Sequence, residues 1–295
     1  MIPAPFEYRA PVSEEELLAL LGKYRESARI LAGGQSLVPA LRSRAARPAV
    51  VVDLRRVAGL RAIEPADDGG LRIGAMATHR EVETSPLVAA RSPLLREVAA
   101  LVGDALARNV GTLVGSVCQA DPAADEPAAL AALDAAVEIA GPRGERIVKA
   151  ADFLQGPFET AIEPDEYVRA VRVPPAAGES AYRREPLGPL GYALAGAACR
   201  IALEDGRVKE ARVAVTGVAP RAYRAFALEE ALAGREAAAL ARSLRSGELA
   251  EEVVRGQEIL GDARASAEYR RHLAAVLARR AILEALGAVG GGPQP

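Results

Sequence analysis

Short apolar runs alternate with amphipathic segments along the chain, and this alternation predicts an α+β fold. Near the N-terminus, the apolar runs 28–31 and 50–53 stand on either side of a glycine turn and a helix-like segment at residues 38–44. Two apolar runs joined by a helix are typical of a βαβ unit with parallel strands. The same reasoning predicts a strand at residues 6–9 and, from the capping box S-E-E-E, a helix at residues 13–24.

The middle of the chain alternates hairpin strands with short helices. Thr78 begins a second capping box, and Ser85 and Ser92 each precede a proline at the first position of a predicted helix. The predicted strands are the runs 61–63, 71–73, 137–140, 146–148 and 166–173, and a further helix is predicted at residues 126–133.

A proline- and alanine-rich segment at residues 174–178 ends this first part. Two prolines stop strand pairing, and the small residues after them are typical of a linker. We therefore predict one domain at residues 1–174, a second at 180–287 and a disordered tail at 288–295. The pattern in the second domain predicts a long hairpin, 193–203 with 208–218, and then helices at 225–233, 236–244, 248–259 and 265–286.

Composition excludes several functional classes. The formal net charge of the 295 residues is −2, which provides no global attraction for nucleic acid or for an anionic membrane surface. No apolar run approaches the roughly 18 residues of a membrane-spanning helix, and the N-terminus lacks the pattern of a signal peptide. Cys118 and Cys199 have no metal-ligand spacing, so we expect a reducing, cytoplasmic location. His79 and His272 are the only two histidines, which excludes a multi-histidine metal site. We expect both at surface or interface positions.

The loop Ala32-Gly33-Gly34-Gln35-Ser36-Leu37 is the first candidate binding element, because it follows a predicted strand and precedes a predicted helix. Glycine allows positive φ and close approach of a ligand to the backbone, while the first N–H groups of a helix lack internal partners. This order of elements is typical of an anion cradle. The alternative interpretation is a simple turn between strand and helix.

A second glycine loop, Arg108-Asn109-Val110-Gly111-Thr112-Leu113-Val114-Gly115-Ser116, supports the first interpretation. Its glycines bracket hydroxyl groups, so backbone and side-chain donors could hold a pyrophosphate. Asp125 follows and could accept a ribose hydroxyl. It could equally cap the helix that begins after it, without any ligand.

Together, the two loops resemble those of the FAD-binding medium subunit of molybdenum hydroxylases, the carbon-monoxide-dehydrogenase and xanthine-dehydrogenase type. The resemblance covers almost the whole chain and includes segments 74–81, 152–160 and 266–271, as well as Glu166. It implies a two-lobed PCMH-type FAD-binding domain, with a break between lobes near residues 54–60, followed by a smaller C-terminal α+β domain.

The resemblance also implies the binding roles of particular residues. Residues 32–37 and 111–116 would grip the pyrophosphate of FAD from two sides, and Asp125 would hold a ribose. Val102 and Arg183 match positions that flank the cofactor in relatives. Tyr192 could stack near the isoalloxazine, or it could be an ordinary core residue at the start of a strand. The residues that the resemblance implies for FAD binding are Ala32, Gly33, Gly34, Gln35, Ser36, Leu37, Val102, Gly111, Thr112, Val114, Gly115, Ser116, Asp125, Arg183 and Tyr192.

The implied activity is electron relay within a complex. A large subunit with the molybdenum cofactor would oxidise the substrate, a small subunit would carry two [2Fe–2S] clusters, and this chain would pass electrons through FAD to an acceptor. Its two cysteines cannot hold an iron–sulfur cluster, so those electrons would come from a partner. The family assembly implies a dimer of heterotrimers.

Two positions depart from the family pattern and motivate an alternative function. Val114 stands where a second glycine is usual, and Gly191 stands where relatives have an acidic residue, in a stretch rich in proline and glycine, 184–192. A β-branched residue takes positive φ poorly. The chain could therefore be a flavin-free structural subunit that keeps the fold and its docking surfaces. A free-standing flavin oxidase or reductase is a third hypothesis.

Overall fold

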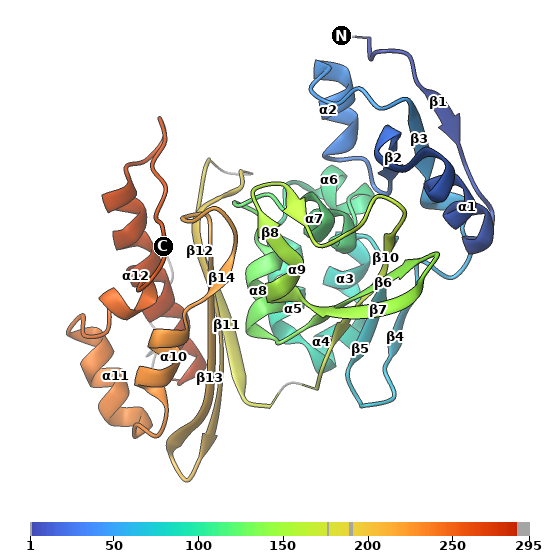
Figure 1. Cartoon of the computed structure of the whole chain (residues 1–295). Coiled ribbons are helices and arrows are strands. Elements are labelled where there is room, and N and C mark those ends of the chain that lie inside the picture. The colour runs from blue at the N-terminus through green and yellow to red at the C-terminus, as the bar shows by residue number, and fades with distance from the viewer. Residues whose placement is uncertain (1, 176, 189–190, 288–295) are drawn as a thin grey trace.

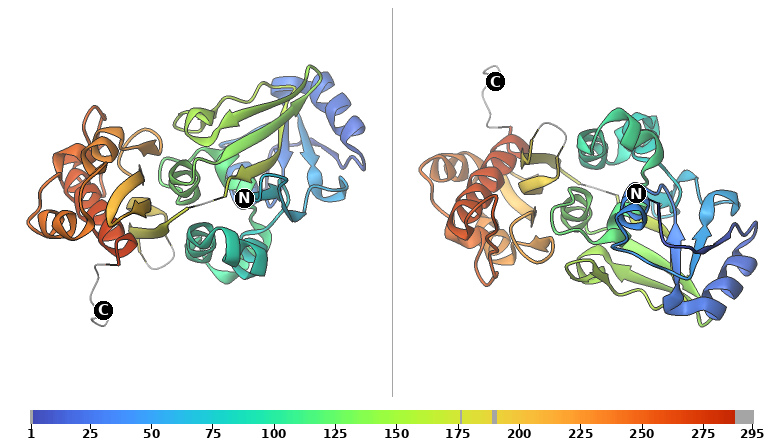
Figure 2. Two further views of the ribbon diagram at one scale, coloured as in Figure 1. Left: turned by 90° about the horizontal axis from the view of Figure 1, so that it is seen from below. Right: turned by 90° about the horizontal axis from the view of Figure 1, so that it is seen from above.

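A computed structural model describes residues 2–175, 177–188 and 191–287. The predicted tail at 288–295 lies outside these residues. The chain forms two lobes and a C-terminal domain, with the second lobe between the other two (Figure 1). Two further views show the same order from above and below (Figure 2). The predicted α+β fold is confirmed.

The first lobe is a small parallel sheet in the order β1-β3-β2, with α1 and α2 around it. The predicted βαβ unit is β2, α2 and β3. Ser13 accepts a hydrogen bond from the N–H of Glu16 as a cap, but the Glu16 carboxylate accepts from Val12 rather than from Ser13. The bounds in this lobe are β1 Glu7–Arg9, α1 Glu14–Tyr24, η1 Arg25–Ser27, β2 Ala28–Leu31, α2 Leu37–Ser43, β3 Val50–Asp53 and η2 Leu54–Arg56.

The second lobe contains a five-stranded antiparallel sheet in the order β4-β5-β10-β6-β7 and most of the short helices. The capping box at Thr78 is present, and Ser85 and Ser92 precede helices that begin at proline. The elements are β4 Ile63–Pro65, β5 Leu71–Gly74, α3 His79–Thr84, α4 Pro86–Arg91, α5 Pro93–Leu101, α6 Ala105–Val110, α7 Leu113–Gln119, α8 Glu126–Ala132, β6 Ala136–Gly141, β7 Gly144–Lys149, α9 Ala150–Phe153, β8 Leu154–Gly156, β9 Glu159–Thr160 and β10 Tyr167–Val173.

The C-terminal domain is a four-stranded antiparallel sheet, β11-β12-β13-β14, with helices on one face. The predicted long hairpin is β12 with β13. The predicted helix at 248–259 is wrong: Leu249 and Gly256 have φ values of +68° and +76°, and only the short 3-10 turn η3 forms between them. The elements are β11 Glu179–Pro186, β12 Ala193–Glu204, β13 Arg207–Thr216, β14 Tyr223–Arg224, α10 Phe226–Leu232, α11 Ala237–Arg245, η3 Glu251–Val253 and α12 Ala267–Ala285.

Both faces of the C-terminal sheet are buried. Side chains alternate between these faces along each strand, so neighbouring residues belong to different cores. Cys199 and Val213 belong to the core shared with α12, whereas the residues next to them, Ala198 and Ala214, belong to the core of the second lobe. Tyr182 of β11 lies on this second face, where its register partner is Ala198. The sheet therefore fixes the C-terminal domain against α8, the helix that follows the second glycine loop.

Candidate functional site

A cleft with a volume of about 1000 Å³ is lined by residues from all three parts of the chain. The sequence-predicted site residues line this one cleft, with the exception of Arg183. They come from the loop after β2, from the start of α7, from the end of α5 and from the segment that precedes β12. The predicted residues in the lining are Ala32, Gly33, Gly34, Gln35, Ser36, Leu37, Val102, Gly111, Thr112, Val114, Gly115, Ser116, Asp125 and Tyr192.

The first glycine loop presents its backbone donors to the cleft. It leaves the carboxyl end of β2, turns at Gly34 with a φ of +78°, and begins α2 at Leu37. The N–H groups of residues 33–37 have no hydrogen-bond acceptor within the described part of the chain. A run of unpaired N–H groups at the start of a helix is an anion-binding arrangement.

The two loops touch each other through their backbones. A Cβ atom on Gly33 would lie 2.2 Å from the carbonyl oxygen of Val110 and 2.7 Å from the Cα of Gly111. Gly111 is confined in turn, because a Cβ there would lie 3.1 Å from the ring of His79. Only glycine allows this approach, so the two loops act as one binding surface.

The second loop is mostly helical, which differs from the second cradle of backbone donors that the sequence predicts. Residues 105–110 form α6, Thr112 caps α7 through its Oγ1, and the N–H groups of Gly111, Leu113, Gly115 and Ser116 all donate to acceptors within the protein. Ser116 Oγ donates to the Glu126 carboxylate. Among the described residues, only the N–H groups of Thr112 and Val114 have no acceptor in this loop. The second loop is therefore mainly a support for the first.

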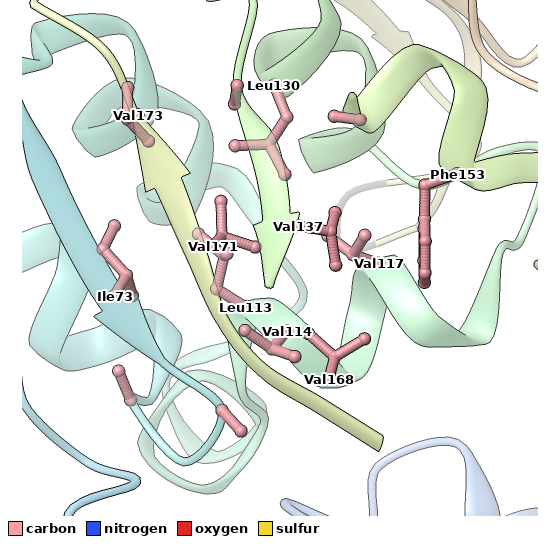
Figure 3. Packing of buried hydrophobic residues seen from close by; sticks show 14 of the residues in the cluster. Ile73, Leu113, Val114, Val117, Leu130, Val137, Phe153, Val168, Val171 and Val173 are labelled. Atoms are coloured by element: carbon pink, nitrogen blue, oxygen red, sulfur yellow. The ribbon is translucent and has the colours of Figure 1, made fainter. Parts of the chain in front are cut away.

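Val114 does not need the conformational freedom of glycine. It lies in the first turn of α7 and is not among the described residues with positive φ. Its side chain is 3% exposed and belongs to the core of the second lobe (Figure 3). The backbone conformation of Val114 therefore gives no reason to doubt flavin binding.

This position gives a first testable prediction. Val114→Gly removes a buried branched side chain from a helix, so the free energy of unfolding should fall by about 2–4 kcal/mol. FAD affinity should not improve. Denaturant unfolding and an FAD titration of both proteins measure the two effects, and a tighter FAD complex in the variant would contradict this explanation.

Asp125 connects the cleft to the C-terminal domain. Its Oδ1 accepts from the Tyr182 hydroxyl at 2.5 Å and its Oδ2 from the Arg184 guanidinium at 2.6 Å. The side chain does not cap α8. Burial raises its pKa from 3.8 to about 6, although Arg184 and Tyr182 oppose the shift. The folded state holds the proton of Asp125 more tightly than the unfolded state does. The contribution of Asp125 to the free energy of unfolding is therefore full below pH 4 and is lost as the pH rises to about 6.

Arg183 lies outside the cleft, although the family resemblance placed it beside the cofactor. Its guanidinium pairs with Glu97 of α5 and Glu284 of α12. Arg184 instead faces Asp125 and also donates to the carbonyl of Leu101 at 2.8 Å. Consecutive strand residues point to opposite faces, so the alternation of β11 separates these two arginines.

Tyr192, from the segment before β12, lines the cleft together with Ser36 of the first loop, whose side chain does not cap α2. Burial, together with the carboxylates of Asp121 and Glu126, raises the pKa of Tyr192, and Ser36 opposes this shift. The phenol is therefore protonated near neutral pH. Tyr192 is 52% exposed and lines the cleft, so it is not the core residue of the alternative interpretation.

His79 is buried, which contradicts the expected surface or interface position. The side chains of His79 and Glu126 are 5% and 2% exposed, and Nδ1 of the ring lies 3.0 Å from a carboxylate oxygen of Glu126. Burial alone would raise the pKa of Glu126, but His79 and the Ser116 hydroxyl outweigh it and lower this pKa below its ordinary value. The carboxylate is therefore ionised at neutral pH.

The sequence did not indicate the roles of three residues that line or support the cleft: His79, Glu126 and Arg184. His79 and Glu126 follow helix caps, and the amphipathic pattern of such short helices does not show which polar residue is buried. The alternation of β11 could have distinguished Arg184 from Arg183 if a core position on that strand had been known.

Redox and metal chemistry of the chain's own side chains is limited. Cys118 lines the cleft, but burial raises its pKa to about 12, so it is a neutral thiol. In the described residues there is no group of three or more His, Cys, Asp or Glu residues that could hold a metal ion. None of the helices in the described residues has the length and apolar character of a membrane span.

Two family models match consecutive parts of the chain. Residues 4–176 match the FAD binding domain in molybdopterin dehydrogenase, and residues 178–285 match the CO dehydrogenase flavoprotein C-terminal domain.

Curated relatives and solved structures agree with these matches. The chain is 38% identical to the carbon monoxide dehydrogenase medium chain of Afipia carboxidovorans, over 96% of this chain and 97% of the relative. It is 35% identical to the nicotine 6-hydroxylase medium subunit of Paenarthrobacter nicotinovorans, over 96% of this chain and 98% of the relative. A structure of carbon monoxide dehydrogenase from Hydrogenophaga pseudoflava superposes with a TM-score of 0.90 and 37% identity, over 98% of this chain and 99% of that one.

These matches cover both domains at an identity that shows the family. The predicted resemblance is confirmed, and with it the class of oxidoreductase subunits. The chain belongs to the FAD-binding medium subunits of molybdenum hydroxylases.

Proposed function

We propose that this chain holds FAD in the cleft between its lobes and passes electrons from a partner's [2Fe–2S] clusters, through the flavin, to an acceptor. The observation that carries the proposal is the run of unpaired N–H groups at residues 33–37, in contact with the second loop. Such donors bind the diphosphate of a dinucleotide. The first loop would therefore hold the pyrophosphate, and the N–H groups of Thr112 and Val114 would be additional donors.

The residues of the cleft fit an FAD molecule. The cavity is large enough for an extended dinucleotide, and residues 33–37, whose N–H groups have no acceptor among the described residues, line it. Bound FAD supplies the redox chemistry, because it accepts and releases electrons that protein side chains cannot carry. Val102 and Tyr192 also line the cleft, where they would orient the cofactor and exclude water.

The partners follow from what this chain lacks. Its two cysteines are both free thiols and cannot hold an iron–sulfur cluster, so a small [2Fe–2S] subunit would supply the electrons and a large molybdenum-cofactor subunit would oxidise the substrate. Free thiols also favour a cytoplasmic location. The same proposal includes a dimer of heterotrimers and the domain division at 1–174 and 180–287.

Reconstitution with FAD tests the cofactor site directly. The purified chain is incubated with FAD, desalted, and its visible absorption recorded. We expect retained flavin absorption close to one FAD per chain, since a cleft built from all three parts closes around the cofactor. FMN is the matched control, because it lacks the diphosphate and adenosine and should be lost on desalting. A colourless product after incubation with FAD would favour the flavin-free structural subunit.

A further inference from the structure

Arg270 of α12 is a buried cation that does not line the cleft. It belongs to segment 266–271, one of the segments in which the sequence resembles the family, and it is 7% exposed. The residue lies in the first turn of a helix that begins at Ala267, where the positive end of the helix dipole disfavours a cation. A guanidinium buried in such a place needs compensating hydrogen bonds. The acceptors of Arg270 therefore indicate what it does.

The guanidinium joins two strand ends of the C-terminal sheet. Nη1 donates to the carbonyl of Leu194, near the start of β12, at 2.8 Å, and to the carbonyl of Gly217, just after β13. Nη2 donates to the Asp262 carboxylate at 2.8 Å, which orients the guanidinium. The two strand ends approach closely, because Gly217 has a φ of +84° and a Cβ there would lie 2.9 Å from the Leu194 carbonyl oxygen. Arg270 thus supplies the donors for two converging carbonyl groups.

The same strand ends hold one wall of the cleft, segment 121–125, three residues of which line the cleft. The carbonyl groups of residues 122–124 all accept hydrogen bonds from the ends of β12 and β13. The donors are the N–H of Ala193 at 3.1 Å, the N–H of Gly217 at 2.8 Å and the hydroxyl of Thr216, which lies 2.9 and 2.7 Å from two of these oxygens. The C-terminal sheet therefore fixes the backbone of this wall.

Two consecutive hydrogen bonds connect the guanidinium to the wall. Gly217 accepts from Arg270 through its carbonyl and donates to Pro122 through its N–H. A second part of the lining depends on the same contacts, since Tyr192 lines the cleft directly before Ala193, whose N–H binds the wall segment. Arg270 therefore supports the cleft from behind, on the side of the C-terminal domain.

We propose that Arg270 is a positioning residue for FAD: it fixes the ends of β12 and β13 and, through them, the wall segment 121–125, without contact with the cofactor. This inference rests on the proposed FAD function. Without the guanidinium, the carbonyl groups of Leu194 and Gly217 converge with no donor between them, which favours separation of the strand ends. The wall then adopts its binding arrangement for only part of the time, and the apparent Kd rises in inverse proportion to that fraction.

Arg270→Met tests the proposal, since methionine keeps much of the side-chain volume and removes every donor. The Kd for FAD should rise about tenfold, which corresponds to a wall in place about a tenth of the time. Isothermal titration measures this at a temperature where circular dichroism shows both proteins folded. Hydrogen exchange of the FAD-free proteins, followed by mass spectrometry, is the second readout. The N–H groups of Ala193 and Gly217, which bind the wall, should exchange about tenfold faster in the variant.

Arg200→Met is the matched control. Arg200 is also 7% exposed and also donates to a backbone carbonyl and a carboxylate, those of Ala177 and Glu210, but none of these residues lines the cleft. Its loss should lower the free energy of unfolding and leave both the Kd for FAD and the exchange of the two N–H groups unchanged. An unchanged Kd in folded R270M, or an equal rise in R200M, would overturn the proposal.

Arg270→Lys decides the matter if the methionine variant does not fold. Lysine keeps the charge but has a single nitrogen, so it loses the contact with Asp262 when it reaches the carbonyl groups. The Kd for FAD should then rise about threefold, against no change in Arg200→Lys, and an unchanged Kd in R270K would contradict the proposed role. Failure of the wild type to bind FAD would refute the proposed function, whereas equal FAD affinity in wild type and Arg270 variants would refute only this inference.

Discussion

Replacement of Gly33 by alanine should raise the Kd for FAD by about 100-fold. The added Cβ would lie 2.2 Å from the Val110 carbonyl oxygen and 2.7 Å from the Gly111 Cα, and both are backbone atoms that cannot rotate away. The two loops must separate, at a cost of about 3 kcal/mol for a clash of this kind, and the separation moves the N–H groups that face the diphosphate. Fluorescence titration of FAD, whose emission changes on binding, measures the loss.

Gly22→Ala is the matched control for this substitution. Gly22 lies on the exposed side of α1, and a Cβ there would meet no atom within 4 Å. The same chemical change should therefore leave the Kd for FAD unchanged and raise the free energy of unfolding by up to about 1 kcal/mol, because alanine favours the helix. Normal FAD affinity in Gly33→Ala would show that the contact between the loops does not matter for binding.

Replacement of Arg184 by methionine should lower the free energy of unfolding by about 3–5 kcal/mol at pH 8. It leaves Asp125 buried without its positive partner, and an uncompensated buried charge is strongly destabilising. The pKa of Asp125 is already about 6 beside Arg184 and should rise further without it. The destabilisation should therefore shrink as the pH falls to 5, because Asp125 is then protonated in both proteins. Urea unfolding at the two pH values measures the difference.

Arg183→Met is the control, because it changes the adjacent residue on the other face of β11. Arg183 pairs with the partly exposed Glu97 and Glu284, so its removal should cost less than about 1 kcal/mol. Adding Asp125→Asn to Arg184→Met should recover part of the stability at pH 8, since the buried charge is gone. Equal effects of the two arginine variants would contradict the assignment of Arg184 to the buried pair.

Most of the fold could be predicted from local pattern. Capping residues such as Thr78 and Ser85 specify where helices begin through hydrogen bonds to nearby N–H groups, and prolines at 174–175 end a strand by removing a donor. The helix predicted at 248–259 failed because Leu249 adopts a left-handed conformation that leucine rarely takes. Leu249 is partly buried against the core of the C-terminal domain, a contact that the local pattern does not show.

The site could be predicted only in part, because some roles depend on contacts between distant segments. The first loop follows from the order of strand, glycine turn and helix. Two donors of the second loop, the Leu113 N–H and the Ser116 hydroxyl, are used internally by Ala77 and Glu126. No spacing rule connects these acceptors to the loop. Burial of His79 is a similar case, since its pairing with Glu126 spans 47 positions and two helices.

A cleft with walls from all three parts of the chain makes the cofactor a further link between units that already contact one another. Ligand at 100 times its Kd adds about 2.7 kcal/mol to the stability of the folded state. Because Ser36, Asp125 and Tyr192 belong to the first lobe, the second lobe and the C-terminal segment, this added stability is shared by the whole chain. Loaded and empty chains should thus differ most in how cooperatively their parts unfold.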